Sequence, residues 1–199
     1  ESKKVLAKEK QLLQKAREEA VKLKEGNNDR KIGDLIEHVL PRRFKDGKKI
    51  IVFTRYIDTL KYLEENLNEK IEQGSVVYRG VKVYSVHGQI NKKKRMTIYD
   101  EFLGEPAAIL ISIDCMAEGI DLQFSSNQIV NYELTWNPNR LEQRNGRVDR
   151  FGQPEDWVHI RTLIMEDTLE MDILNLLIKK ARKIKTDYGF VPGFFGDPK

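Results

Sequence analysis

The chain has 199 residues, of which 35 are Lys or Arg and 31 are Asp or Glu, so its net charge is +4, and 40% of the residues are hydrophobic. This length fits one domain with an appendage, and the apolar fraction excludes a disordered chain. The single cysteine, Cys115, excludes a disulfide scaffold and a multi-cysteine zinc site, so a reducing, cytoplasmic location is expected. No apolar run approaches the ~20 residues of a membrane span, so no membrane contact is expected.

The first part of the chain is predicted to be helical. Residues 1–25 have leucines at heptad spacing in a polar background, which is typical of a long exposed helix. A second helix is expected to begin at an N-cap formed by Asn28 or Asp29 and to end at Pro41, because proline interrupts a helix. Residues 1–40 are therefore expected to form a helical linker or extension.

An alternation of strands and helices is predicted for residues 41–188. The expected strands are 50–53, 81–86, 107–113, 128–132 and 158–163, and the main helices between and after them are around 60–71, 93–103, 140–150 and 168–185. The first and third strands are continuous apolar runs, as in strands buried on both faces of a parallel sheet. The pattern predicts an α/β fold, an open parallel sheet flanked by helices, followed by an irregular tail at 189–199.

Unusual residues follow three of the expected strands. Thr54 and Arg55 follow the first, His87 and Gly88 the second, and the segment 114–121 the third. Any one of them fits an ordinary strand-to-helix turn. Because ligands bind outside the carboxyl ends of the strands in such sheets, the three together favour a binding site at that edge.

The densest polar cluster runs from Gln143 to Arg150. On a helix, Gln143 and Arg147 lie four residues apart and Arg147 and Arg150 three apart, so one face gathers all three. Guanidinium groups on one face repel each other unless an anion lies near, and arginine suits bidentate contact with phosphate. Spacing alone leaves two interpretations open, a phosphate site and a solvated amphipathic helix.

In their order along the chain, these motifs resemble the second RecA-like lobe of a superfamily 2 helicase. The resemblance covers about residues 49–166. Within that group, Trp136-Asn137-Pro138 and the run from Arg147 to Gln153 are similar to the Swi/Snf-like branch of double-stranded DNA translocases, in particular to bacterial and archaeal members. The resemblance implies a RecA-like sheet preceded by a helical extension.

The resemblance also implies which residues face ATP. Gln143, Arg147 and Arg150 match the sixth motif, in which the two arginines touch the γ-phosphate and Arg150 has the arginine-finger position. Gly119 and Asp121 match the fifth motif, in which the acid reaches the ATP ribose and the glycine lies close to the nucleotide.

A second group of residues is implied to contact nucleic acid. These residues are Thr54, Arg55, His87, Gly88 and Ser112. Ser112 is included because Ile113 stands where many helicases have a hydroxyl group. Trp136 is expected to pack under the arginine helix and to couple DNA contact to the arginines.

Two motifs that such a motor needs are missing. The sequence has no Gly-x-x-x-x-Gly-Lys-Ser/Thr loop and no Asp-Glu pair after an apolar strand. ATP and Mg2+ are therefore expected to be held mainly by an N-terminal RecA-like lobe of the same protein, and the chain alone is expected to hydrolyse little or no ATP. No metal site of its own is expected.

The sequence thus predicts the C-terminal motor lobe of an ATP-dependent DNA translocase or helicase, with double-stranded DNA as the expected nucleic acid. Two alternatives stay open. One is the corresponding lobe of an RNA helicase. The other is a nucleic-acid-binding regulatory module without ATPase activity.

Overall fold

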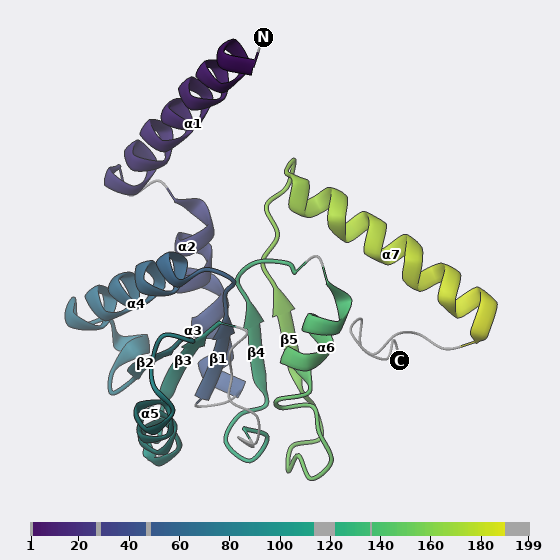
Figure 1. Cartoon of the computed structure of the whole chain (residues 1–199). Helices are drawn as coiled ribbons and strands as arrows, with labels where there is room; N and C mark the ends of the chain where they lie inside the picture. The colour runs from purple at the N-terminus through teal and green to yellow at the C-terminus, as the bar shows by residue number, and fades with distance from the viewer. Residues whose placement is uncertain (1, 27–28, 47–48, 114–121, 136, 190–199) are drawn as a thin grey trace.

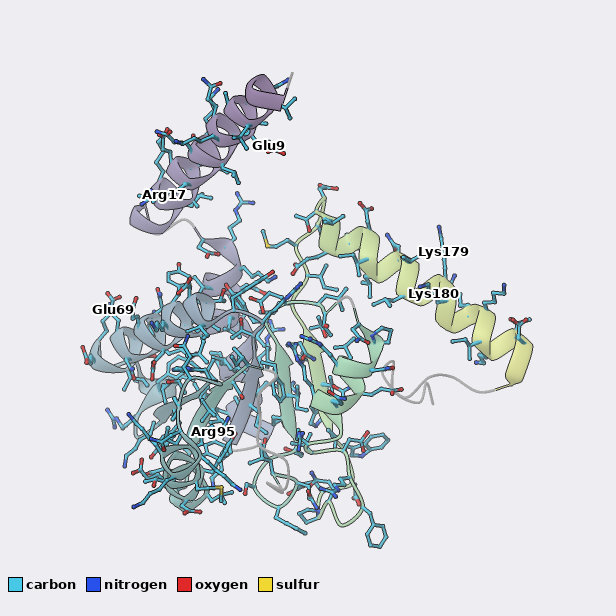
Figure 2. The ribbon with its side chains drawn as sticks, viewed as in Figure 1. Glu9, Arg17, Glu69, Arg95, Lys179 and Lys180 are labelled. Carbon is cyan, nitrogen blue, oxygen red and sulfur yellow. The ribbon has the colours of Figure 1, made fainter. Side chains whose placement is uncertain are left out.

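A computed structural model describes residues 2–26, 29–46, 49–113, 122–135 and 137–189. Its centre is a parallel sheet of five strands in the order β2-β3-β1-β4-β5, with helices on both faces (Figure 1). The strands are β1 Lys49–Phe53, β2 Lys82–Val86, β3 Ala108–Ser112, β4 Gln128–Asn131 and β5 His159–Thr162. The predicted open parallel α/β sheet is confirmed, and each strand lies within two residues of its expected limits.

The helices include two short segments that are not α-helical. The α-helices are α1 Ser2–Glu25, α2 Arg30–Asp34, α3 Leu40–Asp46, α4 Ile57–Glu72, α5 Lys92–Gly104, α6 Pro138–Asn145 and α7 Leu169–Tyr188. A π-helical turn, η1 Leu35–Val39, joins α2 to α3, and a 3-10 turn, η2 Val76–Tyr78, precedes β2. In the described part of the chain, no helix is both long enough and apolar enough to cross a membrane.

The central strand β1 supplies side chains to both faces of the sheet. Ile50 and Val52 point into a core formed with the α2-to-α3 segment and α4, whereas Ile51 and Phe53 point into a second core formed with α5. All four side chains are buried. Successive strand residues face opposite sides, which explains why a strand buried on both faces reads as a continuous apolar run.

The two ends of the described chain relate to the sheet differently. Helix α1 extends away from the sheet in Figure 1 and leaves its leucines exposed, whereas Ile32 and Leu40, farther along the expected 1–40 extension, are buried in the first core. Helix α7 packs through Ile173 and Leu177 onto a third small core shared with α6. The division into 1–40, 41–188 and 189–199 stays a prediction.

The expected end of the second helix at Pro41 is wrong. Asp29 is its N-cap, as predicted, since its side chain accepts hydrogen bonds from the N–H groups of Lys31 and Ile32. The helical path then continues through Pro41, which lies inside α3. In the π turn just before it, the Leu40 N–H donates to the Leu35 carbonyl, five residues back. This wider turn changes the hydrogen-bond register beside Pro41, where the ring would clash with a regular α-helical turn.

A buried tyrosine links this helical segment to the rest of the first core. The Tyr78 hydroxyl donates to the Ile36 carbonyl at 2.6 Å, and its ring packs edge-on against Phe44. Burial raises the pKa of Tyr78, so the phenol stays protonated as a donor.

We expect Tyr78→Phe to lower the free energy of unfolding by about 1–2 kcal/mol, because the buried Ile36 carbonyl loses its donor. Urea unfolding measures this change. Tyr56→Phe is the matched control: Tyr56 is 55% exposed, so its substitution should change stability by less than about 0.5 kcal/mol. Equal effects of the two substitutions would contradict the role assigned to the Tyr78 bond.

Candidate functional site

The carboxyl ends of four neighbouring strands meet at one edge of the sheet. The Thr54 N–H donates to the Ser112 carbonyl at 2.9 Å, and the Tyr132 N–H donates to the Phe53 carbonyl at 2.8 Å. The Ile113 N–H donates to the Val86 carbonyl at 3.3 Å, which continues the contact toward His87. The residues that follow the strands are thus brought together, as the fold rule predicts.

Glu133, the second residue after β4, ties two of these strand ends together. Its Oε1 accepts a hydrogen bond from the Thr54 hydroxyl at 2.9 Å, and its Oε2 accepts one from the Arg55 N–H at 3.1 Å. One carboxylate therefore determines the path of the chain where it leaves β1. The sequence analysis missed Glu133, although the rule that singles out residues after strands also applies to β4.

Opposing effects act on the pKa of Glu133. Burial raises its pKa from the usual value near 4.5, while the bonds from Thr54 and Arg55 and the nearby charges of Lys31 and Arg144 lower it; burial has the larger effect. The folded chain thus holds a proton on this carboxyl more tightly than the unfolded chain does.

Arg144 anchors helix α6 to the same edge of the sheet. Its side chain is only 3% exposed, and its Nη1 donates to Asn131 Oδ1 at 3.1 Å. The guanidinium also lies 5.4 Å from the centre of the Phe53 ring, a cation–π contact with the end of β1. The arginine that sequence analysis passed over within the cluster is therefore a positioning residue.

The expected single helix over 140–150 is wrong. Helix α6 ends at Asn145, and the Gly146 N–H closes its last turn on the Glu142 carbonyl at 2.8 Å. The Arg147 N–H then bonds three residues back, to the Arg144 carbonyl at 3.1 Å. Arg147 and Arg150 thus lie in a series of turns after the helix, so Gln143 and the two arginines do not share one helical face.

This arginine turn, residues 146–153, is held in place by buried groups. Val148 is fully buried in the second core, between Arg147, which is half-buried, and Arg150, which is exposed. The Gln153 side chain donates to the Val148 carbonyl at 2.9 Å and to the Ser126 carbonyl at 3.2 Å. The backbone that carries both arginines is therefore tied to the sheet on either side of Arg150.

The residues predicted to contact nucleic acid differ in their exposure. Thr54 and Ser112 are buried, and the Ser112 hydroxyl donates to the Ile113 carbonyl at 2.9 Å. Their side chains are not accessible to a ligand in this structure, because both hydroxyl groups are used inside the protein. Arg55 and Gly88 are exposed and His87 is half-buried, so these three remain available at the strand ends.

His87 lies at a cavity of about 570 Å³ beside the edge strand β2. Lys94 and Asn91, from the start of α5, line the same cavity. The Asn91 side chain caps α5 by accepting from the Lys94 N–H at 2.9 Å. The buried His87 Nδ1 has no hydrogen-bond partner in the described structure. Glu64 also lines this cavity, and its carboxylate accepts a hydrogen bond from the Ser85 hydroxyl at 2.8 Å. The other groups, an imidazole, an ammonium and a helix N-terminus, suit a phosphate backbone.

Three of the predicted site residues, Gly119, Asp121 and Trp136, lie outside the described residues. Among those described, no group of three or more His, Cys, Asp or Glu side chains is placed to hold a metal ion. The arginine turn carries two guanidinium groups, those of the half-buried Arg147 and the exposed Arg150, on a backbone held by Gln153.

Comparison with known proteins identifies the class of this fold. Residues 30–152 match the family model of the helicase conserved C-terminal domain, and the chain belongs to this family. The ATP-dependent helicase YqhH of Bacillus subtilis, described as uncharacterized, is 39% identical over 136 residues, which are 68% of this chain and 22% of that protein. The RNA polymerase-associated protein RapA of Actinobacillus pleuropneumoniae is 34% identical over 124 residues, 62% of this chain and 12% of RapA.

Solved structures agree with the family match. The SWI2/SNF2 ATPase core of Sulfolobus solfataricus, in complex with dsDNA, has a TM-score of 0.55 at 26% identity. The match covers 80% of this chain and 30% of the Sulfolobus chain. The C-terminal part of the Fun30 ATPase domain has a TM-score of 0.58 at 23% identity and covers 69% of this chain and 43% of that chain. The RecA-like fold and the resemblance to the Swi/Snf-like branch of superfamily 2 are confirmed. The chain spans 22% and 12% of the length of YqhH and RapA.

The raised pKa of Glu133 predicts a pH dependence of stability. Between the unfolded pKa near 4.5 and the higher folded pKa, the folded chain binds more protons, so the free energy of unfolding falls as pH rises. Urea unfolding from about pH 4 to pH 8, compared between the parent chain and Glu133→Gln, isolates this contribution. The difference between the two stabilities should change across that window. A difference that stays constant would show that the two hydrogen-bond donors cancel the effect of burial.

We expect Arg144→Ala to destabilise the fold by about 2–4 kcal/mol, because the Asn131 carboxamide loses a charged donor and the Phe53 ring loses its covering. Arg147→Ala is the control on the same segment, and its half-buried side chain should cost less than about 1 kcal/mol. Thermal unfolding of both variants checks this ranking. The reverse order would mean that α6 is not anchored through Arg144.

Proposed function

We propose that this chain is the C-terminal motor lobe of an ATP-dependent DNA translocase or helicase. In this proposal Arg150 is the arginine finger, Arg147 and Gln143 assist it, and Gly119 and Asp121 contact the nucleotide. The observation that carries the proposal is the arginine turn, in which buried Val148 and the bonds of Gln153 hold the backbone around an exposed Arg150.

The turn suits phosphoryl transfer for an electrostatic reason. Charge in the transition state spreads over the equatorial phosphate oxygens, and a guanidinium that is already in position stabilises it without reorganisation. In the proposal ATP and Mg2+ are held mainly by a first lobe of the same protein, which has the phosphate-binding loop. Binding of ATP between the lobes then draws them together, and hydrolysis releases them.

The nucleic-acid contacts are proposed at the carboxyl ends of β1 and β2. Arg55, His87 and Gly88 would contact the phosphate chain directly, whereas Thr54 would act through Glu133, which holds the Arg55 backbone. Ser112 would contribute through its backbone position, and Trp136 would couple this edge to the arginine turn. Cytoplasmic location belongs to the same proposal.

Double-stranded DNA is the proposed nucleic acid. Its support is the likeness to the Sulfolobus SWI2/SNF2 core, which was solved with dsDNA and is 26% identical to this chain. A structure of the Mss116p DEAD-box domain 2 bound to an RNA duplex has a TM-score of 0.58 at 18% identity, which supports only the shared fold. An RNA helicase lobe is therefore the second candidate, and a module without ATPase activity is the third.

The deciding experiment is steady-state ATPase of the full-length protein with duplex DNA, single-stranded DNA or RNA, alongside Arg150→Ala. Duplex DNA should stimulate hydrolysis. The rate of the variant should be lower by a factor of about 10³–10⁵, the usual contribution of an arginine finger. A surface substitution away from the turn, Lys61→Ala on α4, is the control and should leave the rate unchanged. Stimulation by RNA alone would favour the RNA helicase, and a parent inactive under all conditions would favour the regulatory module.

A further inference from the structure

Two exposed phenylalanines, Phe151 within the arginine turn and Phe124 on a neighbouring loop, form an aromatic patch. Phe151 is 100% exposed and Phe124 is 65% exposed. They come from two loops, one before β4 and one between α6 and β5, which lie next to each other below the sheet in Figure 1.

The two loops that carry the patch are in direct contact. The Gln123 side chain reaches the Phe151 carbonyl at 3.5 Å. The Phe124 ring lies over Gly152, where a Cβ would come within 3.6 Å of its Cζ atom. Gly152 has φ +91°, a conformation that disfavours any side chain, so the ring lies against bare backbone.

Exposure of a phenyl ring to water is unfavourable, and two such rings on neighbouring loops offer apolar area to a surface that approaches them. The position of the patch indicates what covers it. Phe151 directly follows Arg150, and Phe124 follows Asp121 by three residues. Each of the two segments proposed to reach ATP therefore ends in an exposed phenylalanine.

We infer that the aromatic patch docks onto the first, ATP-holding lobe of the same protein when the two lobes close. The inference rests on the proposed function, in which Arg150 reaches a phosphate held by that lobe. Arg150 and Phe151 are consecutive on a backbone tied by Gln153, whose N–H donates to the Arg150 carbonyl at 3.0 Å. Their Cα atoms are therefore only ~3.8 Å apart, so a surface that meets Arg150 lies close to Phe151, and in this inference an apolar part of that surface covers the ring.

Docking of the patch would add an apolar contribution to the free energy of lobe closure, beside the ionic contribution of Arg150. Covering both rings excludes water from the edge of the arginine turn, and lower local polarity strengthens the interaction between guanidinium and phosphate. Arg150 would then supply the chemistry and the patch would supply part of the closing free energy. The two contributions can be separated by substitution.

The test is nucleotide-dependent closure of the full-length protein, followed by energy transfer between one dye on each lobe. The nucleotide is ADP with beryllium fluoride, which imitates ATP without being hydrolysed. Phe151→Ala should raise the concentration needed for half-maximal closure about fivefold to thirtyfold, the range for a central aromatic contact. Phe124→Ala should act in the same direction, and Phe151→Leu, which keeps apolar area, should restore most of the closure.

Val76→Ala is the control, because Val76 is 77% exposed on η2, outside the patch, and should leave closure unchanged. Closure by Phe151→Ala at parent concentrations would overturn the inference. So would a loss of duplex binding without any change in closure, which would make the patch a nucleic-acid contact. A lower melting temperature in both Phe151 variants would assign the ring a structural role instead, and would also overturn it.

The outcome separates this inference from the proposed function. A parent with no ATPase, or with an ATPase that Arg150→Ala does not affect, would remove the proposed function itself. If the parent is active and needs Arg150, but Phe151→Ala closes at the same nucleotide concentration as the parent, only the docking role of the patch is contradicted.

Discussion

The carboxylate of Glu133 is the constraint on which the edge of the sheet depends. It holds the chain as it leaves β1 by accepting from the Thr54 hydroxyl and the Arg55 N–H. Arg144 joins the same edge to α6 through Asn131 and the Phe53 ring. The strand end proposed to contact nucleic acid and the helix before the arginine turn are thus joined to the same edge by hydrogen bonds, of which the bond from Arg144 to Asn131 is buried. Removing one partner of such a bond leaves a polar group unpaired, which is costly where the group is buried.

The arginine turn shows how a flexible side chain can be given a fixed place. Arginine has many rotamers, and most of its conformational entropy is lost when it binds. Burial of Val148 and the bonds of Gln153 hold the backbone beforehand, so that the backbone around Arg150 needs no reordering when a ligand binds. The same turn carries Phe151 directly after Arg150, and this adjacency is the reason for proposing that the exposed ring takes part in lobe closure.

Much of the fold could be predicted because hydrophobic patterning is local. The continuous apolar runs of β1 and β3 indicated strands buried on both faces, and the strand–helix alternation indicated a parallel sheet. The passage of the helix through Pro41 could not be predicted, because the π turn that permits it is stabilised by packing of Leu35 and Leu40 in the core. The end of α6 at Asn145 was also missed, since no proline marks it and Gly146 has ordinary helical φ.

The sequence by itself was enough to identify the family, to single out Arg147 and Arg150 and to locate the strand ends, because these depend on residue type and spacing along the chain. Only the tertiary structure decided which side chains are accessible. Thr54 and Ser112 are hydroxyl residues at the right places, yet both are buried, and Glu133 and Arg144 connect elements that are distant in sequence. The exposure of Phe151 next to Arg150 is likewise visible only in the folded structure. Burial depends on contacts between distant segments, and the spacing of residues along one chain does not contain that information.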